Sequence, residues 1–288
     1  MIKTILVPAT GSQTDDGTFA SALIVARAFD AHLAVLHVRV DAAAMVASMA
    51  TDGSGAAMTG GLVERVDEEA ARRESAANQL FQRFCERERL TIADTPSGER
   101  GPTAQWHREI GDEAYWVREY GRATDLIVIG RPSDDQGGVS IDTTETALVG
   151  TGRPVLIVPA TPLVSLPETI VIAWKSAPEA ARAVTAAMPL LAKTKQIRVV
   201  TVSEEQGLSD EEGARLRTSL SWHGLNASTH HLRPDRLGAA ETLLAFAAEE
   251  QALVVMGAYG HSRLRQWIFG GFTAHVLRGA AVAVLMMH

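Results

Sequence analysis

An internal duplication constrains the fold of this chain more than any other feature of its sequence. The two halves align without a gap for more than 20 residues, starting from Gly130 in the first half and Gly257 in the second. In this alignment Thr146 falls on Thr273. Self-similarity over such a span indicates two copies of one folding unit in tandem.

Each half follows the same order of predicted strands and helices. The predicted strands lie near residues 4–12, 33–38, 105–109, 125–130 and 154–159, and near 169–176, 197–202, 228–232, 252–257 and 281–286. Helical segments separate them, and this alternation predicts a parallel sheet with helices on both faces. We therefore expect an α/β protein of the Rossmann-like class, with two tandem open-sheet domains. Each sheet should be five-stranded and mostly parallel.

A proline-rich segment marks the boundary between the two predicted domains. Residues 159–167 contain three prolines, which is typical of a short extended linker. The predicted domains are therefore 1–160 and 167–288. Two fused domains of one type can form an internal pseudo-dimer, and pairing of two chains through their last strands is also open.

Composition narrows the classes of partner. At 288 residues, with 46% hydrophobic and 21% charged residues, the chain suits two globular domains. Its net charge of -7 lacks the basic character of nucleic-acid binders, and no apolar run reaches the roughly 18 residues that cross a bilayer.

Met1 leads directly into a strand without a signal-peptide pattern, so we expect a cytoplasmic protein. Cys85, the single cysteine, is expected to be a buried structural thiol.

A glycine-punctuated stretch from Gly257 to Thr273 is the main candidate for a binding site. It follows an apolar strand at 252–256 and precedes a helix predicted from Ala274 to Arg278. A strand, a glycine loop and a helix N-terminus form an arrangement that binds phosphates, because glycine lets the backbone approach the anion. Neither a Walker A loop nor a dinucleotide-binding fingerprint occurs in the chain. The competing interpretation is a turn that needs several positive φ angles and holds no ligand.

The chain resembles the tandem universal stress proteins over nearly its whole length. The resemblance rests on the Ile-Leu-Val-Pro strand followed by Gly11-Ser12, on the duplication, and on the spacing of Gly257, Gly260 and Gly270. It implies an adenine nucleotide alpha hydrolase-like fold that binds ATP, ADP or AMP in the second half, with or without Mg²⁺. The nucleotide-binding residues that the resemblance implies are Ala173, Trp174, Val202, Met256, Gly257, Gly260, Gly270, Gly271, Phe272 and Thr273, and His261 and Arg263 are added as candidates because they lie in the same loop.

These residues have different expected roles. The resemblance places Ala173, Trp174 and Val202 beside the base, and the glycine loop around ribose and phosphates. Core packing is the competing interpretation for Trp174. His261 and Arg263 are either donors to phosphate or solvated side chains.

Two departures from the family pattern bear on binding in the second half. The family's aspartate after the first strand is Lys175 here and Thr10 in the first half. Gly271 stands where a small hydroxyl residue is expected, which removes one hydrogen bond to phosphate worth about 1.5–3 kcal/mol. Backbone N–H groups would still bind the anion.

The first half is predicted to be a degenerate nucleotide site. Asp134 and Asp135 would repel a triphosphate. The start of the following helix carries hydroxyl groups that could bind a smaller ligand. They belong to Thr143, Thr144 and Thr146.

No catalytic or metal site is predicted. His230 and His231 are adjacent on a strand and face opposite sides, and no nucleophile is paired with a base. We expect a ligand-linked stress-response or signalling module with an unidentified protein partner and at most slow ATP hydrolysis. The alternative is a structural or protein-interaction module of the same fold that binds no nucleotide. Residues 40–62 are predicted to be a loop, either a lid or a segment without a role, before a long charged helix at 63–87.

Overall fold

The computed structural model covers residues 1–288 and describes all of them except 51–58, 97, 99, 133–137, 204–205, 235, 237 and 259–270. The described strands form one sheet in the order β3-β4-β2-β1-β5-β6-β11-β10-β7-β8-β9. The strands are β1 (Thr4–Pro8), β2 (His32–Arg39), β3 (Thr91–Ile92), β4 (Thr103–Ile110), β5 (Leu126–Gly130), β6 (Val155–Val158), β7 (Thr169–Ala173), β8 (Gln196–Val202), β9 (Ala227–Leu232), β10 (Leu253–Gly257) and β11 (Val284–Met287).

The two halves are joined edge to edge. Neighbouring strands are parallel within each half, whereas β6 pairs with β11 in antiparallel orientation, with Leu156 opposite Leu285. The order β6-β5-β1-β2-β4 repeats as β11-β10-β7-β8-β9, so the antiparallel junction relates the halves by an approximate two-fold axis. The predicted α/β fold with mostly parallel sheets is confirmed. Two features differ from the expectation: the sheets are continuous, and the two-residue strand β3 extends the first one beyond five strands.

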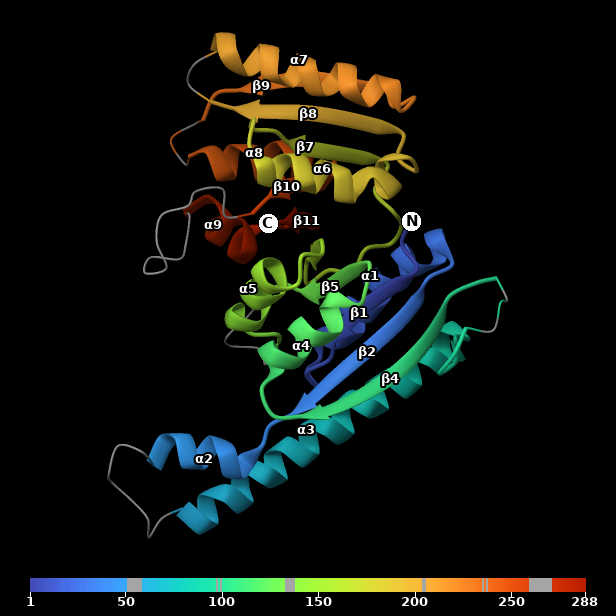
Figure 1. Ribbon diagram of the computed structural model, residues 1–288, viewed down its shortest axis with the longest axis vertical. Helices are drawn as coiled ribbons and strands as arrows, with labels where there is room; N and C mark the ends of the chain where they lie inside the picture. The colour runs from blue at the N-terminus through green and yellow to red at the C-terminus, as the bar shows by residue number, and fades with distance from the viewer. Residues whose placement is uncertain are drawn as a thin grey trace.

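The helices cover the sheet in two layers (Figure 1). They are α1 (Thr14–Phe29), α2 (Ala42–Ala50), α3 (Thr59–Glu88), α4 (Glu113–Arg122), α5 (Ile141–Gly150), α6 (Pro178–Leu191), α7 (Gln206–Trp222), α8 (Ala239–Glu249) and α9 (Gly271–Gly279). One core layer contains apolar side chains of α1, α3, α6 and α7, and the other contains those of α4, α5, α8 and α9. Each layer runs through both halves, because strand residues of β6 and β11 contribute to both cores.

Cys85 lies in the first of these layers. It is 3% exposed on the buried face of α3, beside Phe84, whose ring lies 5.5 Å from that of Phe19. Burial raises the pKa of the Cys85 thiol to about 11, which keeps it protonated. The predicted buried thiol is confirmed.

The prediction of a loop at residues 40–62 is wrong for much of that segment. Residues 42–50 form α2, whose start is capped by the Asp41 carboxylate accepting from the Ala44 amide at 2.9 Å. Alanine has the highest helix propensity, and Val46 is buried at 3% exposure, which together favour a helix over a loop. Met58 lies outside the described residues, and a lid role for the segment stays a prediction.

The long charged helix is confirmed as α3, which begins at Thr59 and runs 30 residues. Its surface carries ion pairs between Glu68 and Arg72 and between Glu69 and Arg73. Figure 1 shows that α2 and the first turns of α3 project together beyond the sheet. No helix in the described ranges combines the length and apolar character that spanning a bilayer requires.

Candidate functional site

A cavity of about 510 Å³ lies at the carboxyl ends of the strands in the first half. This edge of an open parallel sheet is where ligands bind, at the point where the strand order reverses. Here the order reverses at β1, which has β2 on one side and β5 on the other. The polar residues that line the cavity are Thr10, His37, Arg73, Asp112, Glu113 and Ser140.

His37 supplies a hydrogen-bond acceptor to the buried part of this region. It lies near the end of β2, is 3% exposed, and its Nδ1 lies 2.7 Å from the carbonyl oxygen of Ala9. A carbonyl only accepts, so Nδ1 carries the hydrogen and Nε2 is left with a lone pair. Nε2 is buried and has no hydrogen-bond partner among the described residues. Burial lowers the pKa of His37, which keeps the ring neutral.

Glu113 places a partly buried carboxyl group at the start of α4. Its Oε2 accepts a hydrogen bond from the Thr143 hydroxyl at 2.9 Å. Burial raises the pKa of Glu113, and the negative charges of Asp15 and Asp112 raise it further. Asp112 is the N-cap of α4, where its Oδ1 accepts from the Tyr115 amide.

Asp15 adds a third carboxyl group beside the cavity. Its Oδ2 accepts from the amides of Thr10 and Gly11, at 3.0 and 2.7 Å, and its Oδ1 accepts from the Thr10 hydroxyl. Burial raises the pKa of Asp15 to about 6 despite these hydrogen bonds. The end of β1 is therefore held by a carboxyl group from the first turn of α1.

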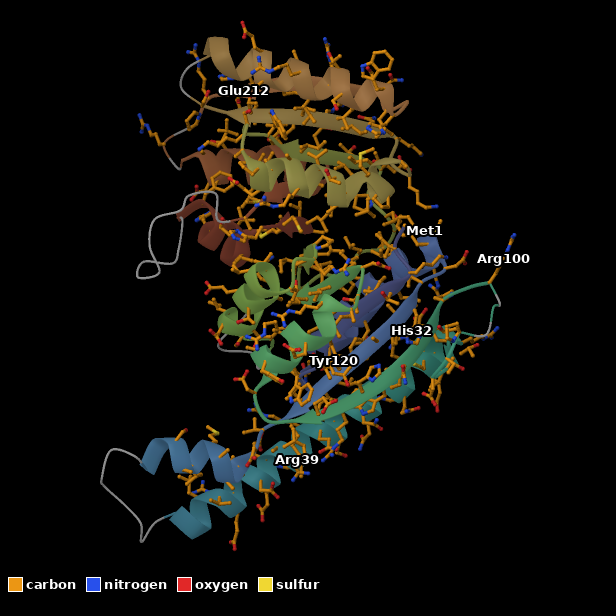
Figure 2. The ribbon with its side chains drawn as sticks, in the orientation of Figure 1. Met1, His32, Arg39, Arg100, Tyr120 and Glu212 are labelled. Carbon is orange, nitrogen blue, oxygen red and sulfur yellow. The ribbon has the colours of Figure 1, made fainter. Side chains whose placement is uncertain are left out.

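Helix α3 closes the cavity from the other side. A Cβ on Gly11 would lie 2.5 Å from the carbonyl oxygen of Arg73, so the loop after β1 touches the α3 backbone. The Arg73 side chain is 59% exposed and donates to Glu69 at 3.0 Å. Farther along, Arg39 at the end of β2 (labelled in Figure 2) contacts Asp67 and Glu74 of α3. These ion pairs fix α3 against the strand end.

The N-terminus of α5 is already occupied by groups of the protein. Ser140 is its N-cap and accepts from the Thr143 amide at 3.0 Å, and Asp142 lies in the first turn. The hydroxyls of Thr143 and Thr144 are buried and donate to Glu113 and to the Ser140 carbonyl. Thr143 and Thr144 were two of the predicted contacts for a small ligand, and their hydroxyls are instead hydrogen-bonded within the protein. Asp134 and Asp135 lie outside the described residues.

In the second half, the described candidate residues divide between the two faces of the sheet. Ala173, Val202 and Phe272 are half-buried against the core of α8 and α9, and Met256 is buried in it. Trp174 packs instead against the core of α6 and α7. This packing supports the interpretation of Trp174 as a core residue.

Gly257 is glycine for a packing reason. A Cβ at this position would lie 2.7 Å from the Ala180 amide nitrogen and 2.8 Å from the Glu179 carbonyl carbon, both in the backbone at the start of α6. Gly271 is the first residue of α9, so this helix begins three residues before the predicted Ala274, and Thr273 is buried in its first turn. Gly260, His261, Arg263 and Gly270 lie outside the described residues.

The sequence model of the universal stress protein family matches residues 1–159 and 167–288. The chain belongs to the universal stress protein family. A search of curated proteins found no match.

Solved structures with the universal stress protein fold cover almost the whole chain. A universal stress protein from Archaeoglobus fulgidus DSM 4304 is 16% identical, with 99% of this chain and 97% of that chain covered and a TM-score of 0.69. A functionally unknown protein from Pseudomonas aeruginosa PAO1 is 17% identical, with 99% and 92% covered and a TM-score of 0.56. At this identity the likeness shows the fold alone.

Apart from Thr10, the resemblance to universal stress proteins did not point to the residues that build the first cavity. Asp15 supplies a carboxyl group to Thr10 from five positions downstream, so it lies outside the strand-end motif. Asp112 and Glu113 are most simply interpreted from sequence as a helix start, and His37 as one polar residue in an apolar strand. That polar interruption was the only available signal. Among the residues that the structure describes, no group of three or more His, Cys, Asp or Glu side chains is arranged to hold a metal ion.

Proposed function

We propose that this universal stress protein binds ATP or a related adenine nucleotide in its second half and acts as a ligand-linked stress-response module. The supporting observation is the start of α9. Helix α9 follows β10 and leads to the parallel strand β11, so its N-terminus lies at the carboxyl edge of the sheet. That edge also carries Ala173 and Val202 at the ends of β7 and β8.

The charge at this helix start favours an anion. The first turn of α9 contains no acidic residue, whereas the equivalent turn of α5 contains Asp142. A helix N-terminus without its own carboxylate leaves backbone N–H groups and the positive end of the helix dipole for a phosphate. Lys175, exposed just beyond β7, adds a positive charge in place of the family's aspartate.

The side chains at this edge are suited to holding a ligand and not to transforming it. Ala173, Val202 and Phe272 are apolar and half-buried, so they offer contact surface to a base or ribose. None of these three side chains can act as a general base, and a positioned general base normally contributes about 10²–10⁴-fold to hydrolysis. We therefore expect slow hydrolysis at most.

The direct test is to purify the protein without added nucleotide, denature it, and identify released small molecules by chromatography and mass spectrometry. Near-stoichiometric ATP, ADP or AMP is the expected result. An empty protein that also fails to bind millimolar ATP would overturn the proposal.

One observation favours the interaction module as the second candidate. Helix α2 has no charged residue, and Met45 on it is 45% exposed where α2 projects from the body (Figure 1). Exposed apolar surface of this kind is typical of protein contacts. The nucleotide measurement separates the two functions, since an interaction module would be empty.

A further inference from the structure

We propose that Arg131 of the first half is a positioning residue for the nucleotide site of the second half. Its side chain holds the end of α9, the helix whose start is proposed to bind phosphate, so the first half sets how tightly the second half binds its nucleotide. This inference rests on the proposed function and goes beyond it, since it gives the first half a part in that binding.

The Arg131 side chain forms a hydrogen bond across the junction between the halves. Arg131 follows β5 directly, and its guanidinium group donates to the carbonyl oxygen of Ala280, the first residue after α9. Ala280 is 3% exposed, and its amide donates to the Val276 carbonyl at 3.1 Å, so the last turn of the helix holds it. The bond therefore anchors α9 from the half that does not contain this helix.

The antiparallel junction explains why Arg131 reaches the other half. The Arg131 amide donates to the Val158 carbonyl at 2.9 Å, which fixes its backbone at the end of β6. Ile157 pairs with Val284, so the end of β6 lies beside the start of β11. Residues 280–283 connect α9 to β11, and they therefore pass the strand end to which Arg131 is bonded.

The two halves obtain an arginine at this helix end in different ways. In the first half, Arg122 at the end of α4 donates to the carbonyl oxygen of Gly150 at the end of α5, at 3.2 Å. The last residue of α8 is instead Glu249, whose carboxylate cannot donate. Ala258 follows β10 as Arg131 follows β5, and its methyl group cannot return the contact to α5. The arginine contact to α9 therefore comes from the first half.

A cation at one end of α9 favours an anion at the other end. The last carbonyl groups of a helix have no partner within it, and they form the negative end of the helix dipole, which a guanidinium group stabilises. Helix α9 has nine residues, a length of about 13 Å, so a shift at its end also moves its start. Without Arg131, part of the nucleotide's binding free energy would be spent on ordering the helix, which lowers the affinity.

The second half holds α9 in other ways, so the helix should remain folded without Arg131. Val276 and Leu277 are buried in the core, and His275 Nε2 lies 3.0 Å from Glu241 Oε1 in the first turn of α8. These contacts act on the side of the helix, whereas Arg131 acts on its end. Removal of the Arg131 side chain should therefore loosen α9 and leave the fold intact.

The test is calorimetric titration of the full-length protein and its variants with ATP. Arg131→Ala should weaken ATP binding by about fivefold or more, because a hydrogen bond from a charged group is lost. Arg131→Lys keeps a positive charge and an N–H donor, so its ATP affinity should stay within about threefold of that of the natural protein. The matched control Arg122→Ala removes the corresponding bond to α5 and should change ATP affinity by less than about twofold.

Amide hydrogen exchange of the nucleotide-free protein reports on the helix itself. Arg131→Ala should speed exchange in α9 by about fivefold or more and leave exchange in α5 unchanged, whereas Arg122→Ala should leave α9 unchanged. A natural protein that binds no ATP would overturn the nucleotide function and this inference with it. This inference alone would be overturned by equal ATP affinity in the natural protein and Arg131→Ala, by equal losses in Arg131→Ala and Arg122→Ala, or by unchanged exchange in α9.

Discussion

The Thr143 hydroxyl at the start of α5 donates a hydrogen bond to the Glu113 carboxylate at the start of α4, at 2.9 Å. This bond joins two helix N-termini beside the cavity of the first half. It engages one of the hydroxyls that the sequence leaves open for a small ligand, and it holds a partly buried acid there. The duplicated halves therefore present different chemistry at equivalent edges of the sheet.

Substitutions of Gly271 should change ATP affinity in opposite directions, depending on the side chain introduced. Gly271→Ser restores a hydroxyl at the start of α9 and should tighten ATP binding about ten- to hundredfold, because a hydrogen bond to a charged group contributes about 1.5–3 kcal/mol. Gly271→Asp should weaken binding at least tenfold by repulsion, although an acid in this turn stabilises the helix. Calorimetric titration measures both. Unchanged affinity in both variants would contradict a phosphate site at α9.

Gly257 should be needed for folding whether or not nucleotide binds. Gly257→Ala places a methyl group within 2.8 Å of the α6 backbone, so it should lower the free energy of unfolding by about 1–3 kcal/mol. The control Gly61→Ala, on α3 with no neighbour within 4 Å, should raise it by about 0.5–1 kcal/mol. Urea unfolding measures both, and equal stabilities would contradict the packing explanation.

Asp15 should give stability a specific dependence on pH. Its pKa rises from the ordinary value of 3.8 to about 6 in the folded protein, so the folded state binds the proton more tightly. The contribution of Asp15 is thus fully present below pH 4 and is lost as pH rises through 6. Relative to Asp15→Asn, the free energy of unfolding of the natural protein should fall by about 2–3 kcal/mol between pH 4 and 7. Urea unfolding across this range checks it, and a difference that is flat or rises with pH would contradict it.

The junction between β6 and β11 should couple the stabilities of the halves. Leu156 and Leu285 are each 1% exposed and lie opposite each other in one core. Leu156→Ala should lower the free energy of unfolding by about 2–5 kcal/mol and reduce hydrogen-exchange protection in both β5 and β10. The control Val164→Ala, at a position 96% exposed in the linker, should have an effect below about 0.5 kcal/mol. Loss of protection in β5 alone would show that the halves unfold independently.

Local pattern was enough to predict the elements that repeat. The apolar strands that end at Gly130 and Gly257 and the charged helix now seen as α3 follow from periodicity. The segment at 42–50 was missed because its Ala, Met and Ser content resembled a loop, whereas the Asp41 cap and burial of Val46 make it helical.

The sequence by itself determined the duplication, the α/β class, the family and the glycine-rich segment that precedes α9. Each of these is recognised from a pattern of residues that lie close together in the chain. Only the tertiary structure decided that β6 pairs with β11, that Trp174 and Val202 pack against opposite core layers, and that His37 and Glu113 line one cavity. The physical reason is that burial and electrostatic coupling depend on which strand ends meet at the sheet edge. A carboxyl group such as Asp15 acquires its raised pKa from that assembly and not from its neighbours in sequence.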